Sequence, residues 1–509
     1  MIFTKNAETS SASGTAQGGS GQSGNSGRSG ASGNSAHSVS PGSPSGQKDN
    51  REVFETMSIP RALAVMAIPT IIGQMVVLIY NLADTYFIGR TGNPYMVGAA
   101  SLVLPLFNLS NAISNFVGVG AGSLISRLLG VHRDEDASKV SAFTFYLALV
   151  CSAAFALAVF AFLDPILTFL GSSSETHEFA RAYAMCVVVI GGVPTITQLT
   201  LAQLLRAVGC SKQAGFGISM GGILNVFLDP LFMFVIMPSG QEILGAGIAT
   251  ALSNTVVLVY FLFMMRRLSR TTVLRLSPRL GMPGRSEITS LVSVGAPACL
   301  SNFLFDLSQM IIDKLMAGYG DIPLAAIGIC LKAERLPLNA GIGISQGMLP
   351  IAAYNYSSGN YKRMRGIISF SRFVGIAIGA VSVVLYEVFG ENIIRFFISD
   401  PQTVAYGTRF IRIRCLATTF MFLCFHYVYV FQAMGRGGIG LFYAVMRQVI
   451  FNIPFMFLFN RIFGMYGLVW AELAADVLTF FFSHLIYLRF NRKVLVPAEK
   501  TREAENASG

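Results

Sequence analysis

The sequence predicts an all-α polytopic membrane protein with twelve transmembrane helices. Of its 509 residues, 53% are hydrophobic and only 12% are charged, whereas soluble domains have about a quarter charged residues. Apolar stretches long enough to cross about 30 Å of hydrocarbon recur from Ile59 onward. Charged side chains gather in the short breaks between these stretches. Most of the chain is therefore expected to face lipid or other apolar helices.

The composition also excludes several classes of protein. The formal net charge is +11, but a nucleic-acid-binding protein would spread such an excess over exposed faces, with aromatic residues between the charges. The seven cysteines stand singly, without the C-x-x-C spacing of zinc or redox sites. An intramembrane enzyme would need clustered histidines or paired catalytic groups, which the sequence does not offer. We therefore expect no nucleic-acid partner, no cofactor and no enzymatic activity.

The segments follow one another in a regular order. Residues 1–50 are dominated by Ser, Gly and Asn, a composition that cannot offset the entropy of ordering, and they form a predicted disordered cytoplasmic tail. The further expected segments are a first six-helix lobe over 57–267, a basic cytoplasmic linker over 268–287, a second six-helix lobe over 288–490 and a cytoplasmic tail over 491–509. The expected spans are 60–90, 94–127, 138–163, 178–206, 213–237, 243–267, 288–319, 323–355, 361–390, 402–434, 440–460 and 465–488.

The distribution of Lys and Arg predicts the topology, because short cytoplasmic loops are enriched in these residues. The breaks after even-numbered spans are basic, whereas those after odd-numbered spans are poorer in cations and contain several acidic residues. Both termini and the linker are therefore predicted to be cytoplasmic. The cations of the even-numbered breaks are Arg127, Arg133 and Lys139, then Arg206 and Lys212, then six arginines of 266–285, then Lys362, Arg363 and Arg365, and finally Arg436. Arg409, Arg412 and Arg414 break the rule at the outer end of span ten, and the sequence alone does not explain them.

The two halves of the chain resemble each other. The run 67–94 is similar to the run 295–323, with Pro69 matching Pro297 and Asp84 matching Asp313. The run 204–216 likewise resembles 430–442, an offset of 226 residues. Six spans per repeat is an even number, so the two bundles are expected to have parallel topology and to face each other across a cleft.

The chain resembles the multidrug and toxic compound extrusion family, which has the polysaccharide-flippase-like transporter fold. The resemblance covers about residues 57 to 490, and it depends on the order, spacing and duplication of several short patterns. These patterns are Pro69, Tyr80, Asp84 and Gly89 in span one, Asn225, Asp229 and Pro230 in span five, and the G-x-G-I-A-T run that ends at Thr250 in span six. The resemblance implies that Asp84, Asn225, Asp229 and Thr250 couple cation movement to export.

The residues themselves support this implication. Asn225 and Asp229 are four residues apart and share a helical face. Carboxylates inside a membrane face a cavity, pair with other groups or take up a proton. The alternative is that both aspartates only accept hydrogen bonds from neighbouring helices. On the 226-residue offset Asn225 and Asp229 fall on Phe451 and Phe455, so the second half lacks such a pair, which favours a coupling role.

Further candidates have less certain roles. Pro69 lacks a backbone donor and is expected to kink span one. Asp306 could line a cavity or belong to a structural salt bridge, and Asp313 and Lys332 fall at similar depth and could pair. The candidate cavity-lining residues are Tyr80, Asp306, Asp313, Lys332 and Glu334. Glu472 and Asp476 are four residues apart in span twelve, and their role stays open between structure and cavity lining.

The sequence thus predicts a monomeric plasma-membrane antiporter. It would take in H⁺ or Na⁺ and export small amphipathic, often cationic, organic compounds by alternating access of its two bundles. The alternative is a flippase for a lipid-linked oligosaccharide or another lipid. Such a protein is expected to line its cavity with several cations, whereas the first lobe offers mainly carboxylates and amides.

Overall fold

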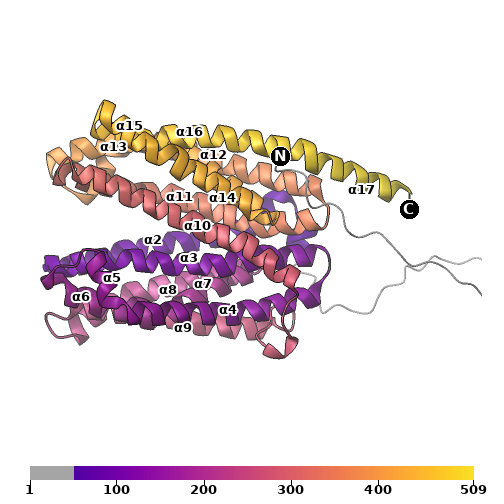
Figure 1. The fold of residues 1–509 in the computed structure, drawn as a ribbon, viewed down its shortest axis with the longest axis horizontal. Coiled ribbons are helices and arrows are strands. Elements are labelled where there is room, and N and C mark those ends of the chain that lie inside the picture. The colour runs from indigo at the N-terminus through magenta and orange to yellow at the C-terminus, as the bar shows by residue number, and fades with distance from the viewer. Residues whose placement is uncertain (1–50, 509) are drawn as a thin grey trace, which may run out of the picture. The chain divides into compact units, whose positions relative to one another are not determined.

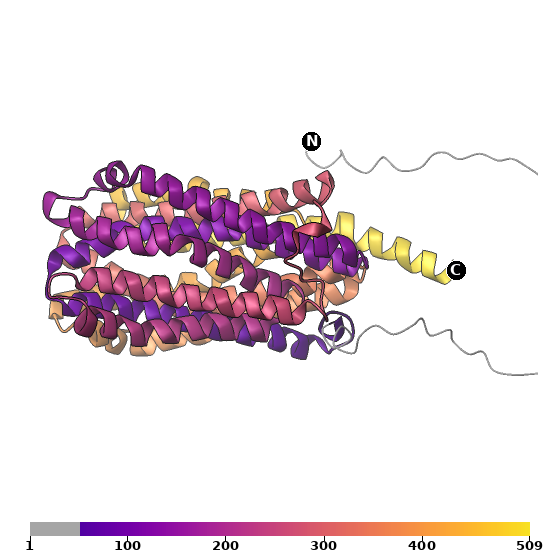
Figure 2. The ribbon, with the colours of Figure 1, turned by 90° about the horizontal axis from the view of Figure 1, so that it is seen from below.

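The computed structural model describes residues 51–508, and helices are the only regular structure within them. The predicted disordered tail 1–50 lies outside the described residues. The helices run side by side along one axis, and the last of them projects beyond one end of the bundle (Figures 1 and 2). We call this the linker end, because the predicted linker 268–287 lies there as well.

The first lobe contains the helices of the amino-terminal half of the chain. They are α2 (Ile59–Arg90), α3 (Pro94–Gly130), α4 (Asp134–Ala161), α5 (Leu163–Phe169), α6 (Ser174–Ala184), η1 (Met185–Ile190), α7 (Gly192–Ala207), α8 (Ser211–Leu231), η2 (Phe232–Ile236) and α9 (Glu242–Leu268). A linker with one short helical turn, η3 (Pro278–Leu280), follows.

The second lobe repeats this order. Its helices are α10 (Arg285–Ala317), α11 (Asp321–Ser357), α12 (Tyr361–Phe397), α13 (Pro401–Ala433), α14 (Gly437–Val445), η4 (Met446–Asn452), α15 (Ile453–Phe463), α16 (Met465–Phe490), η5 (Asn491–Leu495) and α17 (Val496–Ser508). Residues 491–508, expected to be a plain tail, are therefore helical, and Glu499 of α17 forms an ion pair with Arg365 of α12.

The helices confirm the predicted twelve-span architecture. Ten of the helical segments described here are long and apolar enough to cross a membrane, and Ser174–Ile190 with Gly192–Ala207 forms an eleventh span with a bend of 43°. The bend follows a π-helical turn and precedes Pro194, two recognised causes of helix kinks. The twelfth span is α11, whose 37 residues include Lys332, Glu334 and Arg335 and are therefore less apolar.

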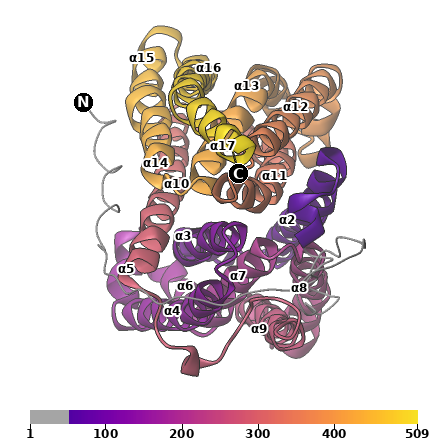
Figure 3. The ribbon, with the colours of Figure 1, turned by 90° about the vertical axis from the view of Figure 1, so that its right-hand side faces the viewer.

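Several helices pack against both lobes, α2 and α10 among them. Helix α2 packs on α8 of its own lobe and on α11 and α12 of the other, and α10 packs on α3 as well as on α14. Viewed along the helices, α2 and α10 lie at the boundary between the lobes (Figure 3). Helix α2 continues unbroken through Pro69. A side chain at Gly215 of α8 would collide with the Pro69 carbonyl group, so α2 and α8 are in backbone contact there.

Close contacts between the lobes gather toward the linker end. A Cβ atom built on Gly347 of α11 would lie 2.7 Å from the backbone of Ala67 in α2, and one on Gly120 of α3 would lie 3.1 Å from Cα of Gly295 in α10. Small residues let helix backbones approach this closely in membranes. The two lobes are therefore tightly apposed at the linker end.

The segment 51–57 reinforces this contact. Arg51 forms a 2.6 Å ion pair with Asp134 at the start of α4. Arg363 at the start of α12 donates a 2.7 Å hydrogen bond from Nε to the Phe54 carbonyl oxygen. The segment thus joins the first lobe to the second.

Side-chain caps fix several helix starts outside the spans. Asn93 accepts a hydrogen bond from the Tyr95 amide before α3, and Asp400 accepts one of 2.8 Å from the Thr403 amide before α13. The hydrogen bonds from Thr403 hold the pKa of the Asp400 carboxyl below its usual range. Polar side chains at these positions satisfy backbone donors that a helix start leaves without partners.

Candidate functional site

A buried polar cluster lies in the first lobe, where four of the sequence-predicted residues meet. Asn225 Nδ2 of α8 donates hydrogen bonds to Asp229 Oδ1 at 3.0 Å and to Thr250 Oγ1 of α9 at 3.3 Å. Asp229 is fully buried and Asn225 is 2% exposed. Asp84 of α2 lies close enough to Asp229 for the two carboxyl groups to interact electrostatically. We call Asp84, Asn225, Asp229 and Thr250 the first-lobe cluster.

Two tyrosines complete the surroundings of this cluster. Tyr80, predicted as a cavity-lining residue, packs against α8 at Gly222 and interacts electrostatically with Asp84 and Asp229. Tyr183 of α6 donates a 3.4 Å hydrogen bond to Asp84 Oδ2. Tyr183 was not among the predicted residues, because it lies in a part of α6 that carries no motif.

Several oxygens of the cluster lack a hydrogen-bond partner. They are Asp84 Oδ1, Asp229 Oδ2 and Asn225 Oδ1, all buried. Buried polar atoms are nearly always paired, so these three oxygens are free to accept from a proton donor, a water molecule or a bound ion. Oxygen atoms are the ligands that hard cations prefer. The arrangement can therefore take up a proton on a carboxylate or hold a small hard cation.

The predicted residues of the second lobe lie apart from one another. Asp306 accepts a 3.4 Å hydrogen bond from Asn108 of α3, which connects the two lobes. Asp313 and Lys332, expected to pair, are both exposed and form no ion pair with each other within residues 51–508. Glu334, two residues after Lys332 in α11, is buried and forms an ion pair with Arg414 of α13 instead.

Glu334 belongs to a buried ion-pair chain that crosses the second lobe. Arg414 lies between Glu334 and Glu472, and Arg447 lies between Glu472 and Asp476. All five side chains belong to residues no more than 4% exposed. We call Glu334, Arg414, Glu472, Arg447 and Asp476 the second-lobe network. It explains why Arg414 departs from the loop charge pattern, since this arginine is not a loop residue.

Arg447 was not among the predicted site residues, although its place in the sequence could have indicated a role. An arginine within an apolar span is costly in a membrane and marks a functional or paired group. Arg206, predicted as a loop cation, is likewise a buried residue of α7, only 4% exposed. Its Nε atom has no hydrogen-bond partner, and it lines a small cavity with Gln203, Gln346 and Tyr429 where the lobes meet.

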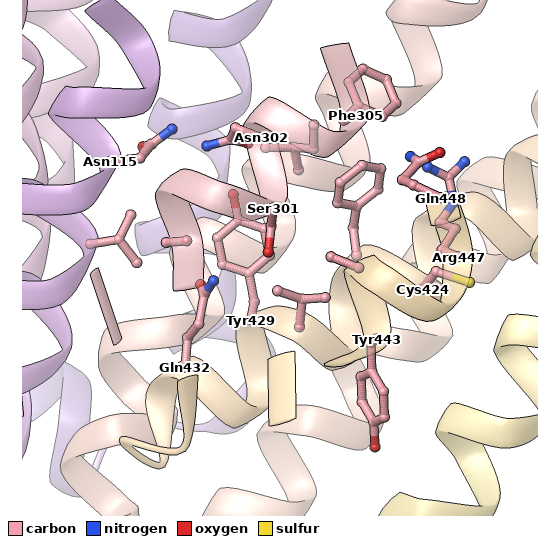
Figure 4. A pocket seen from close by; sticks show the side chains of 16 residues that line it. Asn115, Ser301, Asn302, Phe305, Cys424, Tyr429, Gln432, Tyr443, Arg447 and Gln448 are labelled. Atoms are coloured by element: carbon pink, nitrogen blue, oxygen red, sulfur yellow. The ribbon is translucent and has the colours of Figure 1, made fainter. Parts of the chain in front are cut away.

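A larger cavity borders the second-lobe network. It encloses about 70 Å³, and its lining is mainly aromatic and aliphatic with several amides. Arg447 and Gln448 lie together on one side, whereas Asn115 of α3 and Asn302 of α10 face each other on another (Figure 4). The lining residues are Asn115, Val119, Ala298, Ser301, Asn302, Phe305, Ile342, Cys424, Phe425, Val428, Tyr429, Gln432, Tyr443, Ala444, Arg447 and Gln448. None of the predicted cavity-lining residues borders this cavity.

The structure corrects the register of the internal repeat. A Cβ atom on Gly245 would meet the backbone at Phe232, and one on Gly467 would meet the backbone at Phe459, so these two helix contacts are equivalent. Counting back seven residues from each phenylalanine pairs Asn225 with Asn452, and not with Phe451. The π-helical segment η4 ends at Asn452, and a π-bulge adds one residue to a helix. The offset of 226 residues before it therefore becomes 227 after it.

Comparisons with known proteins agree with this duplication. The family model MatE matches the chain twice, over residues 69–231 and 297–458. The two matches begin at Pro69 and Pro297, which the sequence analysis paired.

Relatives and solved structures extend over most of the chain. The multidrug export protein MepA of Staphylococcus haemolyticus is 28% identical over 452 residues, which are 89% of this chain and 98% of that protein. MepA of Staphylococcus aureus is 28% identical over 450 residues, 88% of this chain and 97% of that one. The outward-facing conformation of a multidrug resistance MATE family transporter of the MOP superfamily superposes with a TM-score of 0.82 at 20% identity, covering 90% of this chain and 100% of that one. The structural likeness shows a shared fold.

Proposed function

The chain belongs to the MatE family of membrane transporters, and we propose that it is an antiporter which exports amphipathic, often cationic, organic compounds in exchange for a proton or a sodium ion. The relatives described above are named multidrug export proteins, which supports this class of cargo. The observation that carries the proposal is the first-lobe cluster, where two carboxyl groups interact and three buried oxygens lack partners.

The cluster has the chemistry that coupling requires. Two carboxylates in one buried site repel each other, so a proton or cation bound between them relieves the repulsion. Release of the proton or cation restores the repulsion between Asp84 and Asp229, and this favours a different arrangement of α2, α8 and α9. A bound cation can shift the balance between two conformations only if it binds one of them more tightly. In our proposal Asp84 and Asp229 provide that difference.

Alternating access follows from the contacts between the lobes. With the linker end on the cytoplasmic side of the plasma membrane, the close contacts at Gly120 and Gly347 seal the route to the cytoplasm. The return to an inward-open state requires α2 and α11, and α3 and α10, to separate at this end. Both lobes would then rock about the far end of the bundle.

The cavity beside Arg447 is the proposed substrate site. It is lined by residues of both lobes, since Asn115 and Val119 belong to α3 and the other lining residues to the second lobe. Its aromatic and amide lining suits flat, amphipathic molecules with hydrogen-bonding groups. At about 70 Å³ it is smaller than drug sites of roughly 300–1,000 Å³. The lobes must therefore move apart around a ligand of that size.

Transport by the purified protein tests the proposal. Proteoliposomes would receive an imposed pH gradient or, separately, an imposed sodium gradient, and ethidium movement against its own gradient would be recorded by fluorescence. We expect one of the two gradients to drive ethidium transport, and an ionophore that collapses that gradient should stop it. Protein-free liposomes serve as the control. Equal ethidium movement with and without both gradients would refute cation-coupled export.

A further inference from the structure

We propose that the second-lobe network is a second proton site, holding one exchangeable proton on Glu334. The inference extends the proposed antiport to the other lobe, although its test needs neither a substrate nor transport. Three carboxyl groups and two guanidinium groups form the network, on α11, α13, α16 and η4. The first-lobe cluster lies on other helices.

The charges of the network do not balance. Three carboxylates against two arginines leave one negative charge, in residues that are at most 4% exposed. A buried charge without a counter-charge is costly, and a carboxylate in that position takes up a proton instead. A proton on one of the three carboxyl groups removes the unbalanced charge without any further ligand.

The hydrogen bonds and ion pairs together identify the carboxyl group that carries this proton. Asp476 uses both oxygens, since Arg447 Nε lies 2.5 Å from Oδ1 and Arg447 Nη2 lies 3.1 Å from Oδ2. Glu472 contacts Arg447 through Oε1, and its Oε2, which makes no hydrogen bond, forms an ion pair with Arg414. Glu334 places only Oε2 against Arg414, at 2.8 Å from Nε and 2.6 Å from Nη2. Its Oε1 is buried without a hydrogen-bond partner. A proton there lets Oε2 keep accepting from Arg414 and leaves the ion pairs of Glu472 and Asp476 intact.

Other titratable groups approach the network from each neighbouring helix. Asp313 of α10 and Cys330 of α11 interact electrostatically with Arg414, and Tyr386 of α12 and Cys415 of α13 interact with Glu334. Arg335 of α11 acts on Asp313 and Asp306. Asp313 and Arg335 carry opposite charges and leave the imbalance of the network unchanged.

The internal repeat places the network at the position of the first-lobe cluster. Gly245 and Gly467 make the equivalent helix contact in the two lobes, and Thr250 and Glu472 each follow five residues later. Asn452, the equivalent of Asn225, is 2% exposed, and its Oδ1 atom also lacks a partner. The two lobes therefore hold polar sites at corresponding places, built from different residues.

Arg447 connects the network to the proposed substrate cavity. Its guanidinium lies 5.4 Å from the ring centre of Phe425 and 5.8 Å from that of Phe305, and all three side chains line the cavity. Its Nη1 atom is buried without a hydrogen-bond partner. A ligand that accepts a hydrogen bond from Arg447 competes with Glu472 and Asp476 for the guanidinium group. Loss of these contacts changes the charge that Glu472 presents to Arg414, and through Arg414 the charge at Glu334. Proton binding and ligand binding are thereby linked.

Infrared difference spectra of the full-length protein in detergent test the inference directly. The spectra would be recorded between mildly acidic and mildly alkaline pH, in the region of the protonated carboxyl C=O stretch. The background would be the double variant Asp84→Asn, Asp229→Asn, which removes the first-lobe carboxyl groups. We expect a band from one further carboxyl group in this background, and its loss when Glu334→Gln is added. This result does not depend on whether Asp84 and Asp229 couple transport.

Two further variants make the outcome decisive. Asp313→Asn, on the facing helix, is the matched control and should leave the Glu334 band in place. Glu334→Asp keeps a carboxyl group at a shorter reach and should shift the band, so it replaces Glu334→Gln if that variant fails to fold. A spectrum that Glu334→Gln leaves unchanged, or a band that Glu334→Asp does not shift, would overturn the proposal and leave the network as a purely structural set of ion pairs.

Discussion

The carboxyl groups of Asp84 and Asp229 can be tested by exchanging one oxygen for an amide nitrogen. Asp84→Asn and Asp229→Asn should each abolish gradient-driven export while the protein stays folded and still binds its ligand. Asparagine retains the size and hydrogen-bonding capacity of aspartate but cannot alternate between charged and neutral forms. A packing role would give only a modest loss, because interhelical hydrogen bonds in membranes contribute about 0.6 kcal/mol on average. Efflux assays with thermal unfolding in detergent measure both effects.

Asp306→Asn is the comparison within the second lobe. We expect a partial defect, because Asp306 contacts Asn108 across the lobes at 3.4 Å but belongs neither to the first-lobe cluster nor to the second-lobe network. Asparagine at this position can still bond to Asn108. If Asp84→Asn and Asp229→Asn export like the parent protein while Asp306→Asn is inactive, the coupling site is in the other lobe.

The sequence could predict the first-lobe cluster because polar residues stand out within apolar spans. Asp84, Asn225, Asp229 and Thr250 each interrupt a hydrophobic run. The structure joins the last three by hydrogen bonds and places Asp84 within electrostatic range of Asp229. Whether they couple transport stays a prediction. Pairings between distant spans could not be predicted, because side-chain depth alone does not fix which helices touch. Glu334 therefore pairs with Arg414, while the expected Asp313 and Lys332 pair is not found.

Backbone contact between α2 and α8 gives a prediction at the level of single helices. A methyl group at Gly215 would lie 2.8 Å from the Pro69 carbonyl carbon, and overpacking of this kind costs about 1–3 kcal/mol. Gly215→Ala should therefore lower the thermal stability of the detergent-solubilised protein. Gly328→Ala on α11 is the matched control, since a side chain there meets nothing within 4 Å. Equal unfolding temperatures for the two variants would contradict the close packing of α2 on α8.

The helices themselves were well predicted, because hydrophobic length and loop charges determine where a span can be. All twelve expected spans overlap helices of the structure. The π-helical turns could not be predicted, since a one-residue insertion leaves the hydrophobic pattern almost unchanged. The turn at Met446–Asn452 caused the one-residue error in the repeat, and with it the mistaken pairing of Asn225 with Phe451.

The contact between the lobes at the linker end gives a prediction for the whole molecule. A Cβ atom on Gly130 at the end of α3 would lie against the Ser357 hydroxyl at the end of α11. The double variant Gly130→Cys, Ser357→Cys should form a disulfide, because the two positions are adjacent. The end of α3 must shift slightly to accept the new side chain, since a Cβ atom at residue 130 also meets the Tyr354 carbonyl group. Oxidation should then stop transport and a reductant should restore it. Each single variant is the control, and unimpaired transport by the oxidised double variant would contradict rocking of the lobes at this end.

Topology is a second prediction at this scale. The positive-inside rule places both termini and the linker in the cytoplasm. A reporter enzyme that functions in the cytoplasm should therefore be active when it is fused after Arg492. A reporter that functions only outside the cell should be inactive at the same position. If a reporter that functions only outside the cell were active at this position instead, the orientation would be opposite to the predicted one. The linker end would then face outward.

The central claim is that a cation bound at the first-lobe cluster is exchanged for an organic compound. Counter-movement of the cation measures this exchange most directly. In proteoliposomes that contain a trapped pH indicator or a sodium indicator, an imposed ethidium gradient should drive a proton or a sodium ion in the opposite direction. Asp84→Asn and Asp229→Asn should abolish this ion movement. Ethidium transport by the parent protein without counter-movement of either ion, or ion exchange by both variants at the parent rate, would contradict the account.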